Sequence, residues 1–216
     1  MRIALAGPSG SGKTTLAEFL TKEFGIPFIS NSAYDVLSVE QKERLKEQYS
    51  YVGSGHRNVI QLSHTKPEFG LDFQNCLLHN RTQLYRENPN MIADRSFIDN
   101  VAYYLAQCGA YQPDEVTKDF ITRAMLAMDE NIDLLIRVRV CNPEETGIEN
   151  NGSRVDSLIY QRQMDVIFEF AMNEMIKIKP DTKIKLLVID WWDLNERKEV
   201  LREKVGEFIE DYNNKG

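Results

Sequence analysis

The chain has 216 residues, of which 42% are hydrophobic and 27% are charged, as is typical of a soluble globular protein. Its formal net charge of −7 argues against a nucleic-acid-binding protein that relies on a basic surface, although a local group of arginines can still hold a small polyanion. The three cysteines, Cys76, Cys108 and Cys141, have neither zinc-site nor redox-motif spacing, which favours free thiols in a reducing cytosol.

The first predicted strand, residues 3–6, runs through a glycine-rich loop into a predicted helix over 13–24. The loop reads Gly7-Pro8-Ser9-Gly10-Ser11-Gly12-Lys13-Thr14, which is a complete G-x-x-x-x-G-K-[ST] phosphate-binding motif in its strand–loop–helix setting. Its glycines let backbone N–H groups converge on an anion, Lys13 can contact the β- and γ-phosphates, and Thr14 can bind Mg²⁺. We therefore expect ATP and Mg²⁺ as cofactors, with the nucleotide held by Ser9, Gly10, Ser11, Gly12, Lys13, Thr14 and Thr15.

Short apolar runs predict four more buried strands, most of them separated by helical patterns, over residues 27–30, 91–93, 134–140 and 184–189. Helices are expected over 13–24, 39–49, 73–86, 98–108, 113–128, 157–178 and 194–212. This alternation predicts an α/β fold, a P-loop NTPase three-layer sandwich with a five-stranded parallel sheet. Ligands are then expected beyond the carboxyl ends of the strands.

Two regions rich in glycine, proline or asparagine are predicted to be irregular. We expect residues 50–70 to form a substrate-binding segment and residues 141–156 to form a mobile lid. Because no repeat or linker divides the chain, residues 1–216 are predicted to form a single domain. The apolar run 186–192 is too short to cross a bilayer, and the early phosphate loop leaves no room for a signal peptide, so we expect a cytoplasmic protein.

The triad Asp94-Arg95-Ser96 directly follows the predicted strand 91–93, at its carboxyl end. Asp94 could hold Mg²⁺ through water or act as a base, and Arg95 could bind a phosphate with two parallel hydrogen bonds. The alternative is a helix-capping aspartate beside a surface arginine. The phosphate loop upstream favours the functional interpretation.

Three further side chains are candidates for substrate contacts. Gln74 lies near the start of a predicted helix, and its amide can both donate to and accept from a base edge. Arg81, two turns later, could meet a phosphate or pair with Asp94. Arg154 is the best candidate for an arginine that closes over the site from the lid, with Arg162 second. For each of them, a solvated surface position is the alternative.

These residues together resemble the P-loop nucleoside and nucleotide kinases. The order Phe73-Gln74, Arg81, Asp94-Arg95-Ser96 looks like deoxynucleoside kinases, which implies that Gln74 binds the base and that Arg95 lies near the reacting phosphate. The pattern Asp94-Arg95 followed by Ala102-Tyr103 is similar to thymidylate kinases, and residues 142–156 resemble their lid. Related single-domain kinases are common among bacteriophage proteins, so a viral source fits the resemblance.

The chain departs from both branches of this family. Deoxynucleoside kinases place a glutamate base just after the second strand, whereas Asp35 is the nearest carboxylate here. The Arg-Glu-Pro-Gly-Gly segment of thymidylate kinases is also missing. A phosphate acceptor is already anionic and needs arginines to position it, whereas a hydroxyl acceptor benefits from a carboxylate base. The missing glutamate therefore favours a monophosphate acceptor.

The expected activity is transfer of the ATP γ-phosphoryl group to a deoxynucleoside monophosphate. Its site comprises catalytic Lys13, Asp94, Arg95 and Arg154, acceptor-binding Gln74, Arg81, Arg95 and Asp35, and the metal-binding pair Thr14 and Asp94. A deoxynucleoside or related riboside kinase with Asp35 or Asp94 as base is the nearer alternative. A regulatory P-loop ATPase that signals to a protein through residues 50–70 is the farther one. We expect a small-molecule nucleotide or nucleoside partner, no nucleic acid and no membrane, and a homodimer is conceivable.

Overall fold

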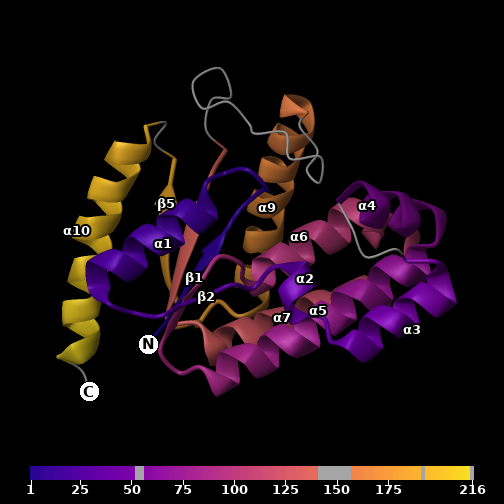
Figure 1. The fold of residues 1–216 in the computed structure, drawn as a ribbon, viewed down its shortest axis with the longest axis horizontal. Helices are drawn as coiled ribbons and strands as arrows, with labels where there is room; N and C mark the ends of the chain where they lie inside the picture. Colours follow the sequence, from indigo (N-terminus) through magenta and orange to yellow (C-terminus); the bar gives the residue numbers. More distant parts are fainter. Residues whose placement is uncertain (52–55, 141–156, 191–192, 215–216) are drawn as a thin grey trace.

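The computed structural model describes residues 1–51, 56–140, 157–190 and 193–214. Its centre is a five-stranded sheet in the order β2-β3-β1-β4-β5, in which every pair of neighbouring strands is parallel (Figure 1). The strands are β1 (Arg2–Ala6), β2 (Phe28–Ile29), β3 (Met91–Ala93), β4 (Leu134–Val138) and β5 (Lys185–Ile189). The predicted α/β sandwich with a five-stranded parallel sheet is therefore confirmed. The predicted lid falls in 141–156, outside the described residues.

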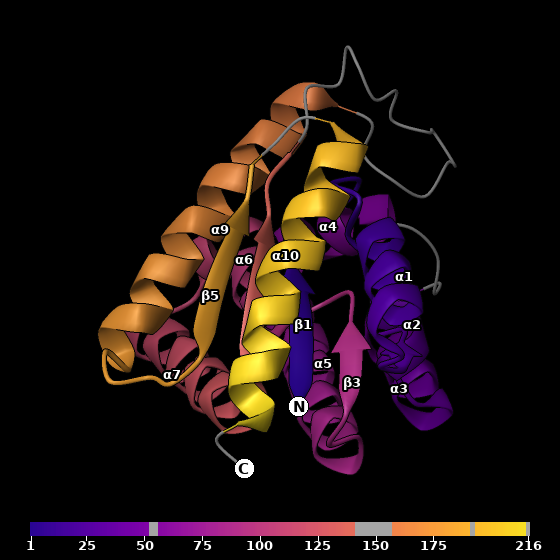
Figure 2. The same cartoon turned by 90° about the vertical axis from the view of Figure 1, so that its left-hand side faces the viewer.

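Helices cover both faces of this sheet. Helices α1 and α10 pack on one face, and α5, α6, α7 and α9 pack on the other (Figure 2). The helices are α1 (Lys13–Phe24), α2 (Ala33–Val36), α3 (Val39–Tyr49), α4 (His56–Thr65), α5 (Pro67–Glu87), α6 (Phe97–Gln107), α7 (Asp114–Asn131), α9 (Leu158–Ile178) and α10 (Leu194–Asn213), with a 3₁₀ turn at Gly109–Tyr111.

The strands are short and apolar because both of their faces are buried. Along β1, Ile3 and Leu5 pack toward α1 and α10, whereas Ala4 and Ala6 pack toward the opposite helical layer. All four side chains are 0% exposed. This two-sided burial explains why the strand has no alternation of apolar and polar residues. The carboxyl ends of β1 and β3 lie side by side, because Ala4 is in register with Ala93.

The prediction of an irregular segment over 50–70 is wrong for most of its length. Helix α4 occupies His56–Thr65, and α5 begins at Pro67, where a missing N–H costs the helix nothing. Buried aromatic rings hold the region together, with Tyr49 and Tyr51 at centroid distances of 5.4 and 5.7 Å from Phe69. Proline therefore starts a helix here instead of marking a loop.

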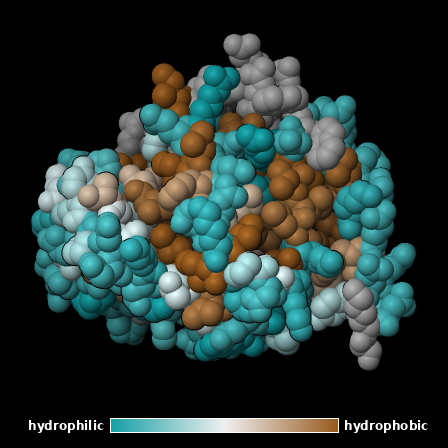
Figure 3. Space-filling view, turned by 180° about the vertical axis from the view of Figure 1, so that it is seen from behind, coloured by the Kyte–Doolittle hydropathy of each residue, from teal (hydrophilic) through white to brown (hydrophobic). Residues whose placement is uncertain are grey.

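Apolar side chains are exposed along α9 and β5, on the side of the molecule seen in Figure 3. Val166 and Phe170 on α9 are 69% and 52% exposed, and Leu186 on β5 is 43% exposed. No helix in the described parts of the chain is long and apolar enough to span a bilayer. The expected homodimer stays a prediction.

Substitution of Leu20 tests how α1 is anchored to the sheet. Helix α1 carries the end of the phosphate loop, so this contact also holds the loop in place. Its side chain is fully buried in the cluster between α1, α10 and the sheet. Because Leu20→Ala leaves a cavity there, we expect it to lower the free energy of unfolding by about 2–5 kcal/mol in urea denaturation. Lys22→Ala, on an exposed position of the same helix, should change it by less than about 0.5 kcal/mol. Equal losses in the two variants would contradict this account.

Candidate functional site

The phosphate loop joins the carboxyl end of β1 to the start of α1, and two of its glycines are required by geometry. A Cβ atom on Gly7 would lie 2.2 Å from the carbonyl oxygen of Val138, which no side chain can tolerate. Gly12 precedes α1 with a φ of 89°, in the left-handed region that other residues rarely adopt. The loop therefore has the conformation that the motif predicts.

Lys13 folds back into this loop. Its ammonium group donates to the carbonyl oxygens of Gly7 and Pro8 at 2.7 and 2.6 Å and to Ser11 Oγ at 3.3 Å. The side chain is 5% exposed. Burial and, next, the positive charge of Arg95 lower the pKa of Lys13 well below its usual value. The amine is thus held in the loop by carbonyl oxygens, where an anion would provide a much stronger partner.

Thr14 and Asp94 come together at the adjacent ends of β1 and β3. Thr14 Oγ1 donates to Asp94 Oδ2 at 2.8 Å, and the backbone N–H of Asn31 donates to Asp94 Oδ1 at 3.3 Å. A hydroxyl and a carboxylate are the hard oxygen ligands that Mg²⁺ prefers. Among the described residues no three His, Cys, Asp or Glu side chains form a metal-binding group. Such a pair suits Mg²⁺, which usually takes one or two protein ligands beside phosphates and water.

Arg95 and Ser96 take different roles at the start of α6. Ser96, not Asp94, caps the helix, in a capping box with Asp99. Arg95 donates to Asp99 Oδ1 at 3.0 Å, and its guanidinium lies 5.8 Å from the centre of the Tyr103 ring. Burial by itself would lower the pKa of Arg95, but Tyr103 and Asp99 outweigh it and raise the pKa. Arg95 therefore keeps its positive charge beside the phosphate loop.

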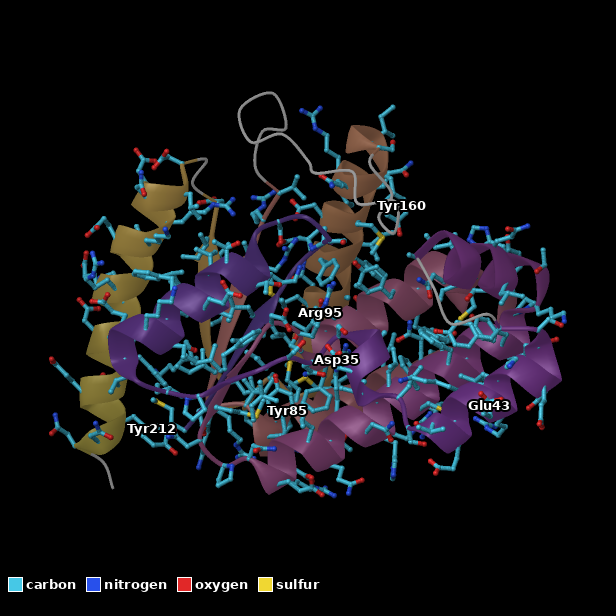
Figure 4. All side chains as sticks on the ribbon, in the orientation of Figure 1. Asp35, Glu43, Tyr85, Arg95, Tyr160 and Tyr212 are labelled. Atoms are coloured by element: carbon cyan, nitrogen blue, oxygen red, sulfur yellow. The ribbon has the colours of Figure 1, made fainter. Side chains whose placement is uncertain are left out.

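A cavity lies next to this arginine, between α5, α6 and the segment that follows β2. In the view of Figure 4, the labelled Arg95 and Asp35 both appear near the middle of the molecule, between the sheet and the outer helices. The cavity is lined by Ser32, Ala33, Val59, Phe73, Gln74, Leu77, Arg81, Arg95, Asp99, Tyr103 and Gln107. The fold thus brings together three of the predicted acceptor-binding side chains, which are Gln74, Arg81 and Arg95.

Arg81 does not pair with Asp94, contrary to one of its two expected roles. Its guanidinium donates to Asn31 Oδ1 at 2.9 Å, to the Asn31 carbonyl oxygen at 3.1 Å and to the Ser96 carbonyl oxygen at 3.3 Å. A fourth hydrogen bond goes to Asn100 Oδ1. Burial lowers the pKa of Arg81 to about 10. Arg81 thus cross-links the end of β2 to α6 and lines the cavity as part of its wall.

Asp35 lies near the cavity but does not line it. Its carboxylate accepts hydrogen bonds from Ser30 Oγ and Ser32 Oγ, both at 2.6 Å. These bonds lower the pKa of Asp35, which makes it a weaker base. Arg154 lies outside the described residues, as does the pair of tryptophans at 191–192. Arg162 is exposed on α9.

Sequence reasoning missed two side chains that shape the site. Asn31 links Arg81 to Asp94, and its position directly after the predicted strand 27–30 was an available signal. Arg197 on α10 donates to the carbonyl oxygens of Ser11 at 2.9 Å and Arg139 at 3.0 Å, and it is 1% exposed. No sequence signal pointed to it, because it lies 186 residues from Ser11.

Comparison with known proteins supports the kinase resemblance. A family described as AAA domain matches residues 2–197. An adenylate kinase of Streptomyces avermitilis is 44% identical over 57 residues, 26% of this chain and 26% of that protein. A cytidylate kinase of Methanobrevibacter smithii is 28% identical over 86 residues, 39% of this chain and 50% of that protein. The matched part of the chain therefore spans half or less of the length of these curated relatives.

Among the solved structures that are similar to this chain, two kinases match it over almost its whole length. Deoxyadenosine kinase from M. mycoides, solved with bound dCTP, has a TM-score of 0.61 at 16% identity over 96% of this chain and 100% of that one. Thymidylate kinase from Candida albicans has a TM-score of 0.56 at 16% identity over 99% of this chain and 92% of that one. At such low identity the likeness concerns the fold, which is the one predicted from the phosphate loop and the Asp94-Arg95-Ser96 triad. The chain belongs to the AAA domain family and has the fold of the P-loop nucleoside and nucleotide kinases.

Proposed function

We propose that this protein transfers the γ-phosphoryl group of ATP to a deoxynucleoside monophosphate. The observation that carries the proposal is the position of Arg95, which lines the cavity and is close enough to Lys13 to lower its pKa. Lys13 thus places one positive charge in the phosphate loop, and Arg95 places a second one in the wall of the neighbouring cavity. Two phosphate groups brought together between them would each have a positive partner.

In this proposal the residues act mainly by positioning and by charge neutralisation, which dominate phosphoryl transfer. Lys13 and the backbone N–H groups of residues 9–14 hold the ATP phosphates, and Arg95 holds the acceptor phosphate. Thr14 and Asp94 would hold Mg²⁺, which neutralises charge on the ATP phosphates. An acceptor oxygen bonds to the γ-phosphorus while the bond to the β,γ-bridging oxygen breaks, and ADP leaves. Arg154 is proposed from the sequence to approach from the segment 141–156.

The carboxylates around the cavity support a phosphate acceptor over a hydroxyl acceptor. Those of Asp94 and Asp99 are engaged by Thr14 and Arg95. Asp35 is held by two serine hydroxyls. Just after β2, where the resembling deoxynucleoside kinases carry a glutamate base, Asn31 carries an amide that cannot take a proton at neutral pH. An acceptor that is already anionic needs no such base.

The second candidate is a deoxynucleoside or related riboside kinase that phosphorylates a 5′-hydroxyl. It is favoured by the overall likeness to deoxyadenosine kinase and by the Phe73-Gln74 pair in the cavity wall. It requires a carboxylate to accept the hydroxyl proton, and the candidates are Asp35 and Asp94. A purely regulatory ATPase is less favoured, because Gln74, Arg81 and Arg95 line one cavity, where a small acceptor could contact all three.

The deciding experiment measures ADP release from Mg·ATP by the purified protein with a panel of deoxynucleosides and deoxynucleoside monophosphates. We expect acceleration by one or more monophosphates and not by the corresponding nucleosides. Acceleration by nucleosides alone would replace the proposal with the second candidate. A basal rate that no acceptor raises would leave the regulatory ATPase. Lys13→Ala must abolish most of the turnover, because a near-normal rate would contradict the mechanism.

Arg95→Lys tests the assignment of Arg95 to the acceptor. Lysine keeps the charge but loses the paired N–H groups that bind a phosphate with two parallel hydrogen bonds. We expect kcat/KM for the acceptor to fall about 10- to 100-fold, while KM for ATP changes little. Arg123→Lys, an exposed position on α7 that pairs with Asp119, is the matched control and should leave both constants unchanged. An equal rise in both KM values would contradict the assignment.

The lowered pKa of Lys13 predicts proton uptake when ATP binds. Burial and the charge of Arg95 favour the neutral amine of Lys13, whereas the negative phosphates of ATP favour the ammonium form. Binding therefore raises the pKa of Lys13, and protons are taken up at any pH between the two values. Titration calorimetry in buffers of different ionisation enthalpy, from pH 7 to 10, measures this uptake. Lys13→Arg keeps the charge at every pH and should lose the uptake, so equal uptake in both proteins would contradict the prediction.

A further inference from the structure

Three side-chain amides form a hydrogen-bonded row, and two of them, Gln74 and Gln107, line the cavity. Asn100, near the start of α6, donates through Nδ2 to Gln74 Oε1 at 3.3 Å. Gln74 in turn donates through Nε2 to Gln107 Oε1, at the end of α6, at 3.4 Å. Gln74 and Gln107 are 2% and 3% exposed, and both line the cavity. Gln107 lies seven positions after Asn100, about 10 Å along the helix, so the row lies along α6 with Gln74 in its middle.

Arg81 determines which way each amide of this row points. A guanidinium only donates hydrogen bonds, so Asn100 must turn its oxygen toward Arg81. The nitrogen of Asn100 then faces Gln74 and requires an oxygen there, which leaves the nitrogen of Gln74 facing Gln107. Gln107 must therefore accept with its oxygen. One buried cation thus orients three amides that would otherwise be free to flip.

The oriented row leaves a defined set of groups for a ligand. Gln74 keeps a second lone pair on Oε1 and a second N–H on Nε2, and Gln107 Nε2 donates to none of the described residues. The hydrogen bonds within the row are longer than the usual length of about 2.9 Å. They orient the amides, and each amide can still form a further hydrogen bond to a ligand. In order from the middle of α6 to its end, the wall offers an acceptor, a donor and a second donor.

We propose that this wall selects cytosine as the base of the acceptor, with Gln107 as a specificity-determining residue. This inference rests on the proposed function, because it assigns the base for the same acceptor site. Cytosine offers an amino donor at N4 followed by acceptors at N3 and O2, which is the complementary order. Gln107 lies eight residues beyond Asp99, the partner of Arg95, or about 12 Å along α6. Arg95 belongs to the phosphate end of the cavity and Gln107 to the base end.

The other bases match this row less well. Adenine offers one donor and one acceptor and leaves the third position without a partner. Thymine carries N3–H between two carbonyl oxygens, so only N3–H and one of the carbonyls can match the row, and Gln107 is left unmatched. Guanine has the order N1–H, O6, N7, but its 2-amino group would stand beside the N1–H, toward the donating nitrogen of Asn100. Each mismatch places a buried polar group without a partner, which costs more than a hydrogen bond contributes.

The test compares kcat/KM for the four deoxynucleoside monophosphates, or for the four deoxynucleosides if those prove to be the acceptors. We expect the wild-type protein to prefer the cytosine compound over each of the others by about tenfold or more. Gln107→Leu should reduce the preference for cytosine over adenine about tenfold, because it removes only the third contact. Gln83→Leu, at an exposed position of α5 where Gln83 bonds to Glu87, is the matched control and should leave the ratio unchanged.

The outcomes separate this inference from the function on which it rests. Turnover with a preference for another base overturns the cytosine assignment and leaves the proposed function standing. A Gln107→Leu protein that loses activity equally on all four bases overturns the specificity role, because a structural role would not change the ratio. ADP release that no nucleotide or nucleoside accelerates removes the proposed function itself. The wild-type ratios need no variant, so they test the assignment even if Gln107→Leu fails to fold.

Discussion

The site depends on one buried guanidinium, that of Arg81. Its four hydrogen bonds reach Asn31 at the end of β2 and both Ser96 and Asn100 at the start of α6. Through Asn31 it is connected to Asp94, and through Asn100 it is connected to Gln74. A buried charge without partners costs several kcal/mol, so these bonds are obligatory once α5 has packed against α6. The same guanidinium therefore holds both the phosphate end and the base end of the cavity in place.

Positive charge is concentrated around the phosphate loop although the chain as a whole is acidic. Arg197 holds the loop carbonyl of Ser11, and Arg137, which is fully buried, pairs with Asp165 just behind Gly7. Together with Lys13 and Arg95, these residues form a field that favours a polyanion. This arrangement lowers the pKa of Lys13, and the two main causes are the burial of its side chain and the positive charge of Arg95. The net charge of −7 thus describes the surface and not the site.

The proposed chemistry depends on which polar groups already have hydrogen-bond partners within the protein and which of them can bind a ligand. The carboxylates of Asp94 and Asp99 already accept hydrogen bonds within the protein, so they are poor candidates for taking a proton from an acceptor. The cation of Arg95 and the amides of Gln74 and Gln107 line the same cavity. In the proposed function, Arg95 would bind the phosphate of the acceptor, and the order of hydrogen-bonding groups along the amides would select its base.

The sequence by itself determined the phosphate loop, the parallel α/β sandwich and the place of Asp94 and Arg95. These follow from local patterns, since short apolar runs, a glycine-rich turn and a residue directly after a strand have the same consequence in any fold of this class. The sequence did not predict the helix His56–Thr65 or the start of the helix Pro67–Glu87, because glycine and proline also occur in loops. In the structure Pro67 begins a helix, and the rings of Tyr49, Tyr51 and Phe69 pack together beside it. The partners of Arg81, the loop contact of Arg197 and the orientation of the three amides were decided only by the tertiary structure. Each of these features joins residues that are distant in the chain. Such contacts form only when packing buries a donor, which must then bond to whichever acceptors surround it in the folded structure.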